Sequence, residues 1–243
     1  MDRTVTRTLI ALTATITLLV AAVVAWAGPA RLTSGAPSHV VLRGVPLPEP
    51  LVAITVDDGP TRAYTPEVLA ILKRHHATAT FFVVGQNAEQ APDLVRAEIA
   101  QGCEVGSHTW SHVRMDRLTA AQVRVEVVRG AEALEAITAR RPLYFRPPRG
   151  LISTAAVDAA TSEGMRTVLW DLTLNHRADR TPEDAARRVL GGIGPGDVIL
   201  LHDGRGDRRR GVAALDLLLT RLEDRGYRFV TLSQLYRAGG VRL

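Results

Sequence analysis

Short apolar runs alternate with amphipathic segments from residue 51 to the end of the chain, and this alternation limits the available folds. Residues with helical spacing predict helices over about 65–76, 89–101, 119–139, 153–163, 181–191 and 211–225. The runs between them are rich in β-branched or aromatic residues and predict strands at 51–56, 79–84, 103–106, 143–146, 166–170, 197–201 and 228–231. Such alternation is typical of parallel β/α units. Seven strands in about 190 residues predict a (β/α) barrel short of the usual eight strands.

Residue types at the predicted helix ends agree with this division. A threonine precedes a proline at two predicted starts, Thr65-Pro66 and Thr181-Pro182, and proline is favoured at the first helical position. Glycine commonly adopts the left-handed conformation that ends a helix. It follows three of the predicted helices, at Gly102, Gly164 and Gly226.

The first 27 residues resemble a targeting segment. Arg3 and Arg7 precede an uncharged, mostly apolar run from Leu9 to Ala27, close to the ~20 residues that span a bilayer. Its end, Ala25-Trp26-Ala27, also fits a signal-peptide cleavage site. Residues 1–27 are therefore either a cleaved signal peptide or an uncleaved anchor that makes the membrane a partner, and the length favours the anchor. Both interpretations place the rest of the chain outside the cytoplasm.

Composition indicates one folded domain after a linker. Residues 28–49 are rich in Pro, Gly and Ser, which suits an extended linker, so the domain is expected over residues 50–240. With 46% hydrophobic residues the chain can form a full core. The net charge is +5, but the basic residues are scattered apart from a short cluster at 205–210. Without an RNA-binding aromatic motif or a recognition helix, we expect no nucleic-acid partner, and we expect a monomer.

Cys103 is the single cysteine of the chain. One cysteine excludes an internal disulfide and a cysteine-based zinc site. Because Cys103 lies in an apolar stretch, we expect a buried structural thiol.

Chemically reactive side chains follow four of the predicted strands. They are Asp57 and Asp58 after the first strand, His108 and His112 after the third, Arg146 after the fourth and His202 after the sixth. In parallel β/α folds the chemistry gathers at the carboxyl ends of the strands. We therefore expect these side chains to share one site.

Two histidines and a carboxylate suggest a metal centre. If the chain is helical at His108 and His112, both imidazoles lie on one face. With an aspartate from another strand they form a site that leaves a position open for water, which is the pattern of catalytic zinc. Each pair has a simpler interpretation when taken alone: Asp-Gly-Pro is good turn chemistry, and the histidines can be two solvated surface residues.

His202 and Arg146 have side chains that could serve the same site. A histidine pKa lies near neutrality, which suits a general acid beside a metal, although a histidine after a buried strand can also be a core residue. Arg146 precedes two prolines that stiffen its loop. A fixed guanidinium there can orient one aspartate and keep it ionised.

Four segments, in order, resemble motifs of the polysaccharide deacetylases (carbohydrate esterase family 4, the NodB-homology domain): TVDDGP, SHTWSH, RPPRG and ILLHD. The segment ATFFVVG at 79–85 also resembles the second strand of that family. The resemblance covers roughly residues 50–238. It implies an α/β fold, a distorted (β/α) barrel of seven or eight strands, preceded here by the N-terminal hydrophobic segment.

The resemblance also implies a role for each motif residue. Asp57 corresponds to the general base, Arg146 to its partner and His202 to the general acid. One divalent ion is implied, with zinc expected and cobalt or nickel compatible with the same ligands. Its ligands would be Asp58, His108 and His112. The backbone N–H of Arg149 corresponds to an oxyanion donor, and Trp170 and Leu200 are expected to contact the substrate.

Two motifs depart from the family pattern. Arg149 stands where the family often has tyrosine, which makes the groove more cationic. In the fourth motif, usually Trp-x-x-Asp-x-x-Asp-Trp, Trp170 is present, but Thr173, His176 and Arg177 replace the last three defining residues.

The first of the missing aspartates commonly tunes the acid histidine in the family. We therefore expect another carboxylate, Asp171 or Asp179, to act on His202. The missing tryptophan affects the expected sugar-binding wall, and so the substrate preference more than the reaction.

The predicted function is metal-dependent removal of N-acetyl groups from an acetylated cell-envelope polysaccharide. Peptidoglycan N-acetylglucosamine is the first substrate to expect and chitin-type oligomers are the next. Two alternatives stay open: an O-acetyl (xylan-type) esterase of the same family, and a catalytically retired carbohydrate-binding domain, which only the degraded fourth motif supports.

Overall fold

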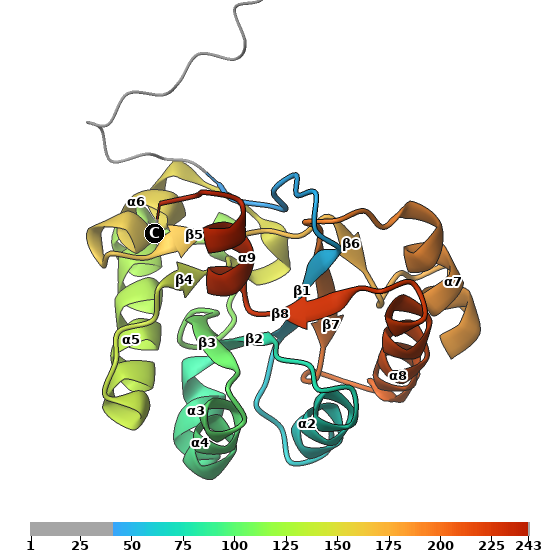
Figure 1. Ribbon diagram of the computed structural model, residues 1–243. Helices are drawn as coiled ribbons and strands as arrows, with labels where there is room; N and C mark the ends of the chain where they lie inside the picture. The colour runs from blue at the N-terminus through green and yellow to red at the C-terminus, as the bar shows by residue number, and fades with distance from the viewer. Residues whose placement is uncertain (1–40, 243) are drawn as a thin grey trace, which may run out of the picture. The chain divides into compact units, whose positions relative to one another are not determined.

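The computed structural model describes residues 41–242, and a curled parallel sheet lies at their centre (Figure 1). Its strands are β1 (Leu51–Asp57), β2 (Thr80–Val83), β3 (Glu104–Ser107), β4 (Tyr144–Phe145), β5 (Arg166–Thr167), β6 (Leu172–Thr173), β7 (Val198–His202) and β8 (Arg228–Val230). Their order is β5-β4-β3-β2-β1-β7-β6, and β8 also pairs with β1. The expected fold class is confirmed.

Helices surround the sheet (Figure 1). They are α2 (Thr65–Arg74), α3 (Gly85–Gln90), α4 (Pro92–Ala100), α5 (Ala120–Thr138), α6 (Thr154–Ser162), α7 (Pro182–Gly192), α8 (Arg209–Glu223) and α9 (Leu232–Ala238), with short 3₁₀ turns at Met115–Arg117 and Pro148–Gly150. Thr119, Thr181 and Thr231 form capping boxes at the starts of α5, α7 and α9. The glycines expected to end helices have positive φ: Gly102, Gly164 and Gly226.

Both faces of β1 are covered, since all seven of its residues are buried. Ile54 and Val56 belong to the main hydrophobic core. Thr55 and Asp57 alternate with them and point to the opposite face of the sheet. Cys103 is buried in the same core, as expected.

Several predicted elements differ in detail from those observed. The strand expected over 166–170 is the two-residue β5, and β6 was not predicted. The helix expected over 89–101 is interrupted at Ala91, which separates α3 from α4. Helix α9 was also missed. No pairing joins β5 to β6 among the described strands, so the barrel is distorted and incompletely closed, as the family resemblance implied.

Residues 41–49, which were expected to belong to the linker, pack against the domain. Leu42 forms a parallel bridge with Val168 beside the edge strand β5, and the N–H of Val45 donates to the carbonyl of Gly196. The predicted targeting segment and the linker up to residue 40 lie outside the described residues. Among the helices of residues 41–242, none is both long and apolar enough to cross a membrane.

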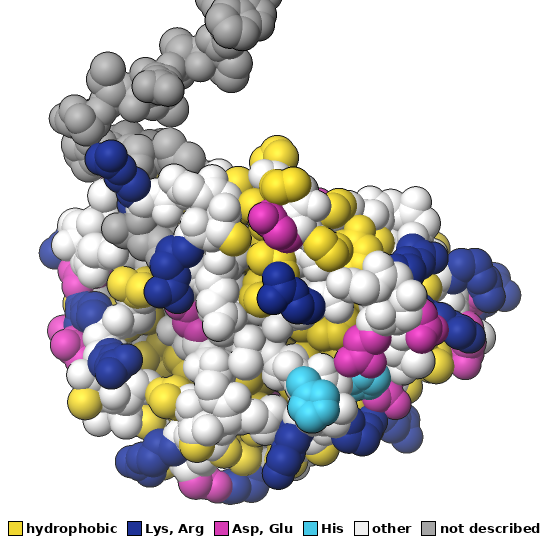
Figure 2. Space-filling view, in the orientation of Figure 1, with side chains coloured by type: hydrophobic (Ala, Val, Ile, Leu, Met, Phe, Trp, Pro, Cys, Tyr) yellow, Lys and Arg dark blue, Asp and Glu magenta, His cyan; other side chains and the backbone are white. Residues whose placement is uncertain are grey.

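Basic side chains are interspersed with acidic ones on the face shown in Figure 2. Several exposed groups of the described residues form ion pairs, such as Arg62 with Asp93 and Arg74 with Asp216. Pairs of this kind contribute little to stability because water screens them.

Candidate active site and metal centre

Arg146 is fully buried at the end of β4 and holds Asp57. Its guanidinium donates to Asp57 Oδ1 over 2.7 Å and to Thr55 Oγ1 over 2.9 Å. The other N–H groups donate to the backbone carbonyls of Val168 and Leu169. Burial lowers the pKa of Arg146, and the charge of Asp57 opposes that change. Because a guanidinium stays protonated in proteins, Asp57 has a fixed cationic partner.

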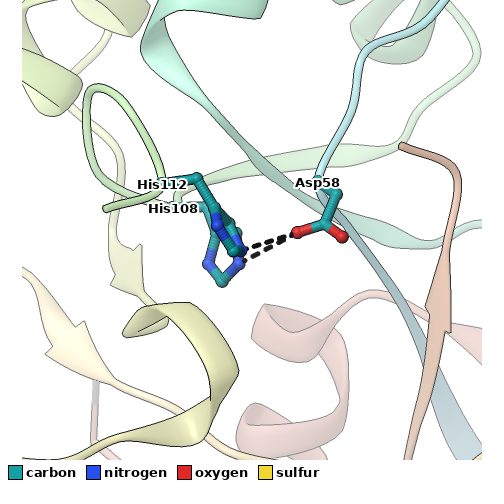
Figure 3. Close-up of side chains that lie close together, drawn as sticks. All are labelled: Asp58, His108 and His112. Carbon is teal, nitrogen blue, oxygen red and sulfur yellow. Dashed lines mark ion pairs between the residues drawn. The ribbon is translucent and has the colours of Figure 1, made fainter. Parts of the chain in front are cut away.

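His108 and His112 reach Asp58 through a turn rather than a helix. Thr109 and His112 have positive φ values of 66° and 55°, so the helical geometry considered for this segment is wrong. Both imidazoles nevertheless face the carboxylate of Asp58 (Figure 3). Its Oδ1 lies 2.9 Å from Nε2 of His112 and 3.5 Å from Nε2 of His108. Each of the three buried residues offers one ligand atom within 4.8 Å of the others.

This donor set fits a divalent cation. Nδ1 of His108 lies 2.7 Å from the backbone carbonyl oxygen of Arg146. A carbonyl only accepts, so Nδ1 carries the proton and Nε2 directs its lone pair toward Asp58. Asp58 Oδ1 is buried and has no hydrogen-bond partner among the described residues. A bound cation would satisfy this atom, as buried polar groups require.

The protonation of Asp58 also suits a ligand. Burial by itself would raise the pKa of Asp58, but the adjacent imidazoles of His108 and His112 hold it well below its ordinary value. Metal binding requires a deprotonated carboxylate, and Asp58 therefore offers the form needed.

Arg208 contacts the second oxygen of the same carboxylate. Its Nη2 lies 3.1 Å from Asp58 Oδ2, and its Nε donates to the carbonyl of Gly204. Arg208 fixes the carboxylate with Oδ1 toward the histidines. Sequence reasoning missed this residue, because nothing local distinguishes it within the basic cluster at 205–210.

His202 ends β7 and lies beside Asp57 in the β1–β7 register. Asn175 Oδ1 is 2.9 Å from the backbone nitrogen of His202 and 3.0 Å from its Nδ1. Because a backbone N–H can only donate, this Asn175 atom is an acceptor and Nδ1 of His202 carries the facing proton. Burial lowers the pKa of His202, while the charges of Asp57 and Asp58 oppose that change.

Neither aspartate expected to act on His202 hydrogen-bonds to it. Asp171 accepts from the backbone N–H groups of Gly44 and Val198, and Asp179 pairs with Arg188 over 2.6 Å. The expectation of a carboxylate partner was wrong. The partner is the neutral amide of Asn175, which lies next to the degraded part of the fourth motif.

Asp203 holds the end of β1 in place through hydrogen bonds. Sequence reasoning did not single it out. Its buried Oδ2 accepts from Thr65 Oγ1 over 2.5 Å, and its backbone N–H donates to the carbonyl of Asp57. Thr65 is the first residue of α2. Burial raises the pKa of Asp203 to about 7, although the hydrogen bond from Thr65 opposes this. These contacts tie the start of α2 to the end of β1.

A cleft of about 740 Å³ contains the expected base, acid and metal ligands, whereas Arg146 is buried behind Asp57 and does not line it. Its lining residues are Asp57, Asp58, His108, His112, Arg149, Trp170, Arg177, His202, Arg205 and Arg208. Arg149 sits in a tight turn with a φ of 61°. Leu200 is buried within β7 and does not line the cleft, so its contact with substrate stays a prediction.

Several known proteins similar to this chain are polysaccharide deacetylases. Residues 44–168 match the family model described as polysaccharide deacetylase. A peptidoglycan-N-acetylglucosamine deacetylase of Bacillus cereus is 38% identical over 203 residues, which cover 83% of this chain and 95% of that protein. A peptidoglycan-N-acetylmuramic acid deacetylase of Bacillus subtilis is 34% identical over 185 residues, which cover 76% of this chain but 38% of that protein.

The fold agrees with a solved structure as well. The structure of the Bc1960 peptidoglycan N-acetylglucosamine deacetylase matches with a TM-score of 0.76 and 32% identity. The match covers 80% of this chain and 92% of that one.

Proposed function

Because this chain belongs to the polysaccharide deacetylase family, we propose that it removes N-acetyl groups from cell-envelope polysaccharide. Peptidoglycan N-acetylglucosamine is the first candidate substrate and chitin-type oligomers are the second. The observation that carries the proposal is the convergence of Asp58, His108 and His112 beside the Asp57–Arg146 pair in one cleft. The apolar N-terminal run supports action outside the cytoplasm, either secreted or membrane-anchored.

Asp58, His108 and His112 would hold one divalent ion. Two imidazoles and one carboxylate suit zinc, and cobalt or nickel fit the same ligands. When bound, such an ion supplies Lewis acidity that polarises a carbonyl and lowers the pKa of water.

Asp57 is the proposed general base. Its buried carboxylate accepts a hydrogen bond from Arg146 at Oδ1, which fixes its orientation and leaves Oδ2 to accept a proton from the attacking water. The backbone N–H of Arg149 is the proposed donor to the oxyanion that forms at the acetyl carbonyl oxygen when water adds to the carbonyl carbon.

His202 is the proposed general acid. Its Nδ1 proton is engaged by Asn175, so Nε2 is the atom that delivers a proton to the leaving amine nitrogen. Acetate and a free amino sugar are the products. Trp170 lines the cleft and is proposed to contact the sugar, as is Leu200.

Acetate release by the full chain tests this function. N-acetylated peptidoglycan and chitin oligomers would be compared with added zinc or cobalt, with a chelator, and with the variants Asp57→Asn and His202→Ala. We expect metal-dependent release that both variants lose. Bound metal and bound glycan without release in the wild-type protein would contradict the proposal and indicate the retired, carbohydrate-binding alternative.

A further inference from the structure

The cleft has more cationic side chains than its carboxylates can pair. Asp57 is paired with Arg146 and Asp58 with Arg208. Three further arginines line the cleft, and we call them the rim arginines: Arg149, Arg177 and Arg205. All three are exposed. Within residues 41–242, none of them forms an ion pair.

The rim arginines converge from separate parts of the chain. Arg149 follows β4, Arg177 follows β6 and Arg205 follows β7. Because these strands end at the same edge of the sheet, the three guanidinium groups face one cleft and not three unrelated surfaces.

Two rim arginines occupy backbone positions that favour glycine. Both Arg149 and Arg205 have a φ of 61°, a left-handed conformation that is unfavourable for a residue with a Cβ atom. Glycine follows each of them in the chain, at Gly150 and Gly206. Each position therefore carries a long cationic side chain in a conformation that would be less strained with glycine.

The chemistry of guanidinium identifies what these side chains can bind. A guanidinium forms two parallel hydrogen bonds with a carboxylate, and such charge-assisted bonds are stronger than those to neutral groups. A chitin oligomer has no anionic group to offer. Peptidoglycan does, because alternate sugars carry a lactyl group whose carboxylate is either free or extended by a peptide that itself ends in carboxylates.

We propose that the rim arginines bind a carboxylate of the substrate, so that this protein prefers an acidic glycan whose carboxylate lies on the acetylated sugar or on its neighbour. The inference rests on the proposed deacetylation and adds the charge of the substrate to it. It ranks peptidoglycan strands above chitin-type oligomers on a physical basis.

Substrates that differ only in their carboxylates isolate the effect of substrate charge on the rate. Initial rates of the full chain would be measured on peptide-free peptidoglycan strands, on the same strands with their carboxylates converted to methyl amides, and on intact muropeptide. We expect kcat/KM to be about tenfold higher on the acidic than on the amidated strands, since one charge-assisted hydrogen bond is worth about that factor. Equal values would overturn the inference. A preference for muropeptide over peptide-free strands would assign the carboxylate to the peptide.

Variants test two of the three rim arginines, Arg177 and Arg205. Arg177→Gln and Arg205→Gly should each lower the ratio of acidic to amidated kcat/KM, and together should lower it further, with Arg149 left as the remaining rim arginine. Arg205→Gly also removes the backbone strain, so its thermal stability should match or exceed the wild type. If Arg205 had only a structural role, a variant of equal or higher stability would keep the preference for acidic over amidated strands. Arg96→Gln removes one charge from exposed surface outside the cleft and should leave the ratio unchanged.

Binding without turnover distinguishes failure of the inference from failure of the proposed function. Calorimetric titration of the His202→Ala variant with acidic and amidated strands needs no hydrolysis. Tighter binding of the acidic strands supports the inference even if the wild type proves inactive. Equal binding of both, or equally tight binding of polyglutamate, would overturn it, the second result by showing an unselective attraction to polyanions.

Discussion

At the ends of β1, β3 and β4, the side chains of Asp57, His108 and Arg146 are almost fully buried, with exposed fractions of 2%, 2% and 0%. At the ends of β6 and β7, His202 and its partner Asn175 are only partly buried. We call Asp57, Asp58, His108, His112 and Arg146 the metal half of the site, and His202 with Asn175 the acid half. In the metal half, ion pairs with buried carboxylates fix the side chains. In the acid half, the neutral amide of Asn175 fixes the imidazole of His202. Substitutions should therefore damage stability in the first and proton transfer in the second.

The largest effect is expected for Arg146→Met in the metal half. This variant leaves Asp57 buried without a cationic partner, which typically costs about 3–5 kcal/mol. Urea unfolding would measure the loss. The double variant Asp57→Asn, Arg146→Met carries no unpaired charge and should recover part of the stability. A loss below about 1 kcal/mol in the single variant would show that the pair is effectively solvated and that the contrast between the halves is weaker than the burial indicates.

Metal removal should give the next effect. A ligand at a hundred times its Kd stabilises the folded state by about 2.7 kcal/mol, so zinc should raise the Tm of the wild-type protein and a chelator should reverse the rise. His112→Ala should abolish that response because it removes one of three ligands. His176→Ala, an exposed histidine outside the ligand set, is the control. A persistent response in His112→Ala would place the ion elsewhere.

Sequence reasoning located the two aspartates of the metal half because they lie at the end of a regular buried strand. Asp57 ends a seven-residue strand whose apolar pattern is plain, and Asp58 follows it directly. The acid half has no such pattern. Strand β6 is two residues long, too short to show a period, and Asn175 is linked to His202 by tertiary contact across 27 positions. Nothing in the sequence order selects Asn175 over the two aspartates that were expected.

Asn175 offers the most direct test of the acid half. Asn175→Leu removes the acceptor for Nδ1 of His202 and should lower kcat about tenfold, part of the larger factor that a general acid contributes. Asn175→Asp should instead raise the pKa of His202 by adding a negative charge. Since the acid must be protonated, activity falls as pH rises through that pKa, and the alkaline limb of kcat should move to higher pH. An unmoved limb would show that His202 is not the group that titrates.

His75 shows what carboxylate partners do to an imidazole, and it should give the smallest effect. It joins α2 to α8, with Nδ1 2.8 Å from Glu223 and Nε2 2.9 Å from Asp216. Burial opposes the charged form, but the bonds to Glu223 and Asp216 raise the pKa of His75 overall, opposite to the direction at His202. A pKa raised by folding stabilises the protein below the pKa of the unfolded chain, and this contribution is lost as pH rises through the folded pKa.

The Tm difference between the wild type and His75→Gln should therefore be larger near about pH 5.5 than well above the ordinary histidine pKa of about 6.5. Because both carboxylates are more than 40% exposed, solvent screening limits the effect to about 1 kcal/mol or less, or about 2–4 °C. His76→Gln, the exposed neighbour, should show no such dependence. A pH-independent difference for His75→Gln would mean that packing, not charge, holds the two helices together, and that the opposite pKa directions at His75 and His202 do not follow from their partners.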